Sequence, residues 1–89
     1  EAQRLQEIRT HLLERRCEAL IELDRLDDAL AALEVLIAEQ PYRERPRRLQ
    51  MLALYRAGRQ AEALRCFQAF RSFLAEEVGV DPSDELVQL

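Results

Sequence analysis

"LDDALAALEVLIAEQPYRERPRRLQMLALYRAGRQAEALRCFQAF", residues 26–70, decides the fold because it contains one pattern twice. The heptapeptide "DDALAAL" is followed 34 positions later by "AEALRCF". Over a wider window, residues 19–30 match residues 53–64 at five of twelve positions, so we take the repeat as real. The chain is therefore built from two copies of one structural unit.

A 34-residue period is typical of tetratricopeptide repeats, in which each unit is a pair of antiparallel helices. The sequence predicts an all-α fold of tetratricopeptide-like helical hairpins, forming a single domain over residues 1–89. We expect the first repeat at residues 10–43, the second at residues 44–77, and the start of a capping helix from residue 82. Because such repeats normally stack in threes or more, we also expect missing repeats or a closely packed neighbouring domain.

Apolar spacing and helix-breaking residues predict where the helices begin and end. Four complete helices are expected at residues 2–23, 27–40, 44–57 and 60–77. Pro41 ends the second helix, because the residue before a proline avoids helical angles. Gly58 and Gly79 suit the left-handed position that ends the third and fourth helices. Asp24 or Asp27 is expected to cap the start of the second helix.

The same spacing predicts which side chains face the core. The expected inward residues are Leu5, Ile8, Leu12, Leu13, Leu20 and Leu23 in the first helix, Leu30, Leu33, Val35, Leu36 and Ile37 in the second, Leu49, Leu52 and Tyr55 in the third, and Leu64, Phe67, Phe70 and Leu74 in the fourth. Ala29 and Ala63 are expected where paired helices approach most closely, because a large side chain there would hold the helices apart.

The composition fits a small globular domain with no catalytic or metal centre. The 89 residues are 48% hydrophobic and 34% charged, a balance that excludes a disordered chain. Cys17 and Cys66 lack metal-binding spacing, so we expect free thiols, which suit a reducing cytoplasm. His11 stands alone, and no nucleophile–base pair or glycine-rich phosphate loop is present. We therefore expect no enzyme activity, no cofactor, no metal and no membrane span.

Two ordered blocks in the second half of the chain resemble a known family. The first block contains "PYRER" at residues 41–45 and "LYRAGRQAEAL" at residues 54–64. The second contains Arg71 and "LAEEVGVDPSDEL" at residues 74–86. These blocks are similar to the bacterial transcriptional activator domain of actinobacterial antibiotic regulatory proteins and related regulators. The resemblance covers residues 12–89 and departs at Pro46, where the family more often has an aliphatic or aromatic residue.

The resemblance implies a cytoplasmic transcription regulator in which this domain mediates protein interaction and oligomerisation. Residues 1–89 would then be a fragment of a longer multidomain regulator, and DNA would be bound by a missing N-terminal winged helix-turn-helix. The implied partners are a second copy, neighbouring domains or RNA polymerase. No catalytic or binding residue is carried over from the family, because the shared residues look architectural.

Two other functions also fit a tetratricopeptide-like fragment. One is a generic scaffold that docks peptides, and the other is a regulatory segment of a multidomain signalling ATPase or cyclase. A winged helix elsewhere in the parent chain would favour the transcription regulator. Further 34-residue repeats alone would favour the scaffold, and a phosphate-binding loop would favour the enzyme.

Charge is distributed unevenly along the chain. Residues 1–42 carry five arginines and ten acids, residues 43–73 carry eight arginines and two acids, and residues 74–89 carry five acids, giving net charges of −5, +6 and −5. We expect three acids of the first helix to face three arginines of the third helix, namely Glu14, Glu18 and Glu22 opposite Arg45, Arg48 and Arg56. The repeat template places Glu14 level with Arg48, and Glu22 level with Arg56.

Two alternatives to this internal pairing remain open. The arginines could form a protein-binding patch, or they could bind nucleic-acid phosphate through Arg43, Arg45, Arg47 and Arg48. The net charge of −4 argues against phosphate binding, which needs a surplus of positive surface. The candidate partner-binding residues are Arg45, Arg48, Tyr55 and Arg56.

Overall fold

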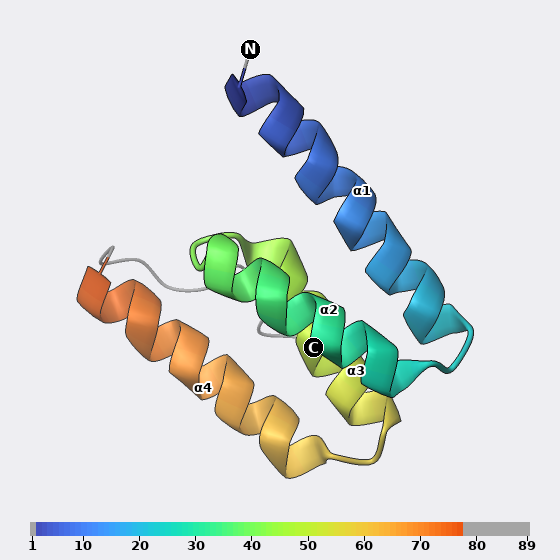
Figure 1. Cartoon of the computed structure of the whole chain (residues 1–89). Helices are drawn as coiled ribbons and strands as arrows, with labels where there is room; N and C mark the ends of the chain where they lie inside the picture. Colours follow the sequence, from blue (N-terminus) through green and yellow to red (C-terminus); the bar gives the residue numbers. More distant parts are fainter. Residues whose placement is uncertain (1, 78–89) are drawn as a thin grey trace.

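Four helices form two consecutive hairpins in the computed structural model, which describes residues 2–77 (Figure 1). Their bounds are α1 Ala2–Glu22, α2 Leu26–Glu39, α3 Glu44–Arg56 and α4 Gln60–Glu77. The predicted all-α hairpin fold is confirmed, and every predicted helix end within this range lies within one residue of the observed end. Gly79 and the predicted capping helix lie outside the described residues.

The two hairpins turn in the same way at positions 34 residues apart. Asp24 has a φ angle of 61° and Gly58 a φ angle of 79°, so both are left-handed. The next residue donates its main-chain N–H back to the end of the preceding helix, from Arg25 to the Leu20 carbonyl and from Arg59 to the Leu54 carbonyl, each at 2.8 Å. These bonds and the left-handed residue make the same helix-ending motif in both repeats.

The predicted aspartate cap of α2 is wrong. Arg25 occupies the N-cap position, and its side chain makes no capping hydrogen bond. Asp24 cannot cap α2, because its left-handed backbone forms part of the turn that ends α1. Asp27 lies one residue inside the helix with Asp28, where a carboxylate interacts favourably with the helix dipole without capping it.

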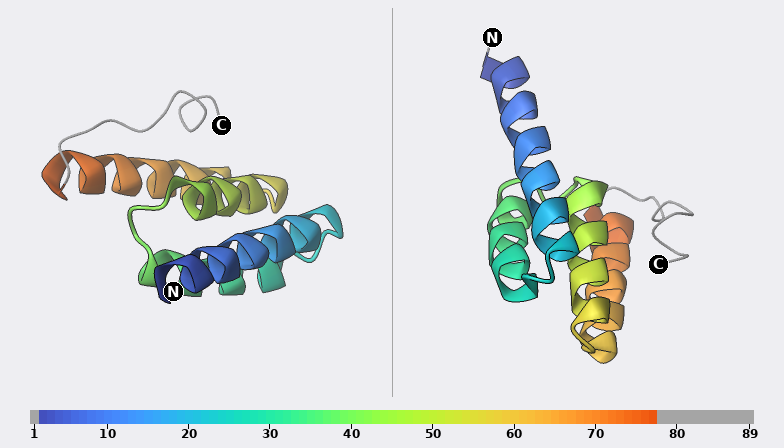
Figure 2. Two further views of the ribbon diagram at one scale, coloured as in Figure 1. Left: turned by 90° about the horizontal axis from the view of Figure 1, so that it is seen from above. Right: turned by 90° about the vertical axis from the view of Figure 1, so that its right-hand side faces the viewer.

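The core lies along α2 and α3, with α1 and α4 packed at its two ends. Figure 2 shows the two hairpins as stacked layers. Cys17 and Ile21 of α1 pack with Leu33 of α2 and Ala53 of α3. A second cluster joins α3 to α4 through residues that include Met51, Leu54, Phe70 and Leu74. Ala29 and Ala63, which were expected between paired helices, are both buried in the core clusters.

The inward face of α1 differs from the prediction. Of the six expected residues only Leu20 is buried, whereas four are 50–68% exposed, namely Leu5, Ile8, Leu12 and Leu23. The buried face instead carries Thr10, Glu14, Cys17 and Ile21. Apolar residues lie on two opposite sides of α1, and helical periodicity alone favours the side with more leucines. Packing against α2 and α3 selects the other side.

Three further residues predicted to face the core are exposed. They are 56–60% exposed, namely Val35 on α2, Tyr55 on α3 and Leu64 on α4. Phe67 and Phe70, in contrast, pack in the core as expected. Within residues 2–77, none of the helices is both long and apolar enough to cross a membrane.

Pro46, the departure from the family pattern, is accommodated inside α3. It is the third residue of a helix that begins at Glu44, and it is buried. The first four N–H groups of a helix have no partner within the helix, so the missing donor of a proline costs nothing at this position.

Candidate protein-interaction surface

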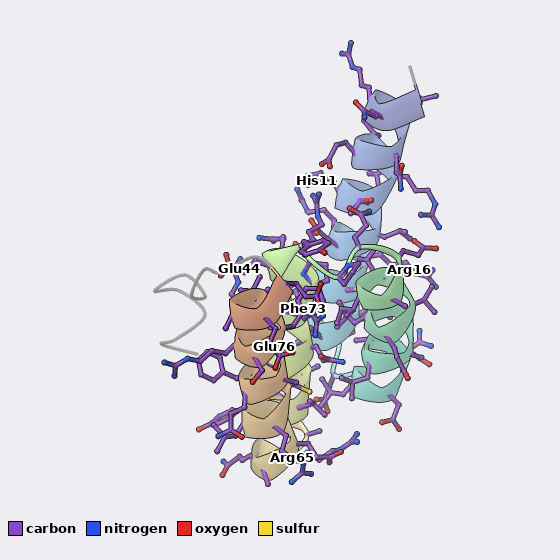
Figure 3. All side chains as sticks on the ribbon, turned by 90° about the vertical axis from the view of Figure 1, so that its left-hand side faces the viewer. His11, Arg16, Glu44, Arg65, Phe73 and Glu76 are labelled. Atoms are coloured by element: carbon purple, nitrogen blue, oxygen red, sulfur yellow. The ribbon has the colours of Figure 1, made fainter. Side chains whose placement is uncertain are left out.

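A groove of about 580 Å³ lies between α1 and the start of α3. Its lining is almost entirely charged or polar and consists of His11, Glu14, Arg15, Glu18, Ala19, Glu22, Arg43 and Arg45. Figure 3 labels His11 on α1 and Glu44 at the first turn of α3, on either side of this region. The groove is therefore where the acidic first segment of the chain meets the arginine-rich segment.

A buried carboxylate holds the two sides of the groove together. The side chain of Glu14 is 1% exposed, and its Oε2 accepts a 2.6 Å hydrogen bond from Arg43 Nε. Arg43 Nη1 also donates to both oxygens of Glu7, at 3.0 Å each. The hydrogen bond to Glu14, reinforced by Glu7, raises the pKa of Arg43 above its ordinary value. Charge-assisted bonds of this kind are stronger than neutral ones, so this pair fixes α3 against α1.

Arg45 continues the network one turn further along α1. It pairs with Glu18 through Nη2, and its Nε lies 3.8 Å from Oε1 of Glu14. Glu18 also lies 3.7 Å from Arg15 on its own helix. Internal pairing between the acids of α1 and the arginines of α3 is therefore confirmed for Arg45.

The register of the pairing differs from the repeat template. Arg56 Nη1 donates to the main-chain carbonyl of Ile21 at 3.4 Å, and among the described residues it makes no ion pair with Glu22. Side chains meet across α1 and α3 at offset positions, such as Glu18 with Arg45.

The four candidate partner-binding residues share one side of α3, because positions 45, 48, 55 and 56 recur at helical spacing. Only Arg45 lines the groove. Arg48 is half-buried, Arg56 is exposed, and Tyr55 is 56% exposed. The structure therefore brings these residues onto one face of a helix but gathers only one of them into the groove.

The family model of the bacterial transcriptional activator domain matches residues 1–89. The chain belongs to this family. Its relatives include the regulatory protein AfsR of Streptomyces griseus, 49% identical over 97% of this chain and 9% of the relative. The regulatory protein DnrI of Streptomyces peucetius is 39% identical over the whole chain and 33% of the relative.

A third relative is the transcriptional regulatory protein EmbR of Mycobacterium tuberculosis, 38% identical over 80% of this chain and 18% of the relative. The chain thus spans a third or less of the length of each of these curated relatives. These relatives are named as regulators, and the family description names a transcriptional activator. The chain therefore belongs to a family of transcription regulators.

Sequence reasoning missed a cation–aromatic cluster in this activator domain. The guanidinium of Arg47 lies 4.8 Å from the ring centre of Phe70 and 5.7 Å from that of Phe73. Phe73 in turn contacts Tyr42, with ring centres 5.0 Å apart. Burial lowers the pKa of Arg47, because desolvation disfavours the charged guanidinium, and within residues 2–77 no carboxylate pairs with it. The cluster ties the start of α3 to the end of α4, and its only sequence signal was the spacing of Phe70 and Phe73.

The two cysteines have structural surroundings. Cys17 is buried and Cys66 is half-buried, and burial raises the pKa of both thiols above the ordinary value. A raised pKa keeps a thiol protonated and unreactive near neutral pH. Among the described residues, no three His, Cys, Asp or Glu side chains are grouped so that they could hold a metal ion.

Proposed function

We propose that this domain is the regulatory protein-interaction module of a bacterial transcriptional activator that works in the cytoplasm. DNA would be bound by another domain of the parent regulator, a winged helix-turn-helix. The exposed side of α3 that carries Arg45, Arg48, Tyr55 and Arg56 would contact a protein partner. That partner is a neighbouring domain, a second copy or RNA polymerase.

The observation that carries the proposal is the internal engagement of the arginine cluster. Arg43 and Arg45 pair with acids of α1. Arg47 lies over two aromatic rings and donates to the Pro41 carbonyl at 3.2 Å, and Arg48 also has an intramolecular interaction. Nucleic-acid binding needs uncompensated positive charge that can displace counterions from phosphate. Engaged arginines in a chain of net charge −4 argue against phosphate binding, so the proposed contact rests on the exposed Tyr55 and Arg56.

The exposure of Tyr55 supports α3 as the contact surface. Tyr55 is 56% exposed, and the next residue, Arg56, is also exposed. Tyrosine and arginine are enriched among the residues that contribute most to protein–protein binding, because each combines a broad contact area with hydrogen-bond donors. A protein surface with carboxylates would complement this pair.

The test separates DNA binding from activation in the parent regulator. We expect Tyr55→Ala with Arg56→Glu to reduce activation of a reporter gene about tenfold, the loss of roughly 1.4 kcal/mol of contact energy. Affinity for operator DNA should stay unchanged. Arg71→Glu, a charge reversal at an exposed position on α4, is the matched control. Equal loss of operator affinity, or full activation by the double variant, contradicts the proposal.

A further inference from the structure

We draw no further inference here: the strongest candidate, the exposed apolar stripe of Leu5, Ile8 and Leu12 on the outward face of α1, carries none because nothing in the structure shows what covers it.

Discussion

Asp24 and Gly58 occupy the same left-handed position in two turns that are 34 residues apart. The two residues share no chemistry, but each lets its chain segment close a helix with the same pair of main-chain hydrogen bonds. An aspartate tolerates this conformation better than most side chains, and glycine tolerates it best. The repeat is therefore conserved in backbone geometry at a position where the sequence has changed.

Substitution of Gly58 should be limited by backbone strain alone. No heavy atom lies within 4 Å of where a Cβ would be placed, so Gly58→Ala creates no clash. We expect a loss of about 1 kcal/mol in the free energy of unfolding, the cost of a left-handed alanine. Gly58→Asp should cost clearly less, because the chain already uses aspartate at the equivalent turn. Urea denaturation measures the free energy of unfolding of both variants. Equal losses would show that the left-handed φ angle does not determine which residues the turn tolerates.

The buried pair between Glu14 and Arg43 should respond unequally to loss of either partner. Arg43→Met leaves a carboxylate that is 1% exposed with its close hydrogen bond removed, which should cost about 3 kcal/mol. Glu14→Gln leaves an arginine that is 25% exposed, can turn towards water and keeps Glu7, so the loss should be smaller. Thermal and urea unfolding of the two variants test this order. A greater loss in Glu14→Gln would contradict the buried position of the carboxylate.

A double-mutant cycle should place the ionic coupling between Glu18 and Arg45. Both side chains are about one-third exposed, so the coupling energy should be about 0.5 kcal/mol and should fall in high salt. The control cycle joins Glu22 and Arg56, which the repeat template aligns but the structure does not pair. It should give no coupling energy. Coupling in the control cycle alone would mean that the template register is correct and the observed register is not.

Arg47 should tolerate an apolar residue better than a lysine. Its guanidinium lies on aromatic rings without a carboxylate partner among the described residues, and burial already disfavours its charge. Arg47→Met removes the desolvated charge and keeps the contacts of the side-chain stem. Arg47→Lys places a more strongly hydrated ammonium there and should cost about 1 kcal/mol. Urea unfolding measures the stability of both variants. A lysine variant that is more stable than the methionine variant would contradict this account of the cluster.

The sequence was sufficient to predict the fold because helix ends and repeat period are local signals. Pro41 and Gly58 mark ends that depend on backbone angles alone, and both ends are observed as predicted. The orientation of α1 could not be predicted in this way. Its leucines form the more regular stripe, but Cys17 and Ile21 meet α2 and α3, and that choice depends on packing between distant segments.

The candidate surface was predicted in outline but not in detail. Attraction between the acids of α1 and the arginines of α3 followed from charge distribution, and Arg45 bears it out. The partners of Arg43 and Arg56 depend on the offset between two helices, which no sequence spacing gives. The burial of Glu14 was also missed, because a glutamate is almost never fully buried unless it is paired, and its partner Arg43 could not be found from sequence spacing.

The measurement that tests the central claim most directly compares DNA binding by the 89-residue chain and by the longer regulator to which we propose that it belongs. Fluorescence anisotropy with operator DNA is followed across a salt titration for both proteins. Our account predicts that the parent binds and the isolated domain does not, because its arginine cluster is engaged within the fold. Binding by the isolated domain with a steep salt dependence would contradict the account, since arginines free to displace counterions would then contact phosphate directly.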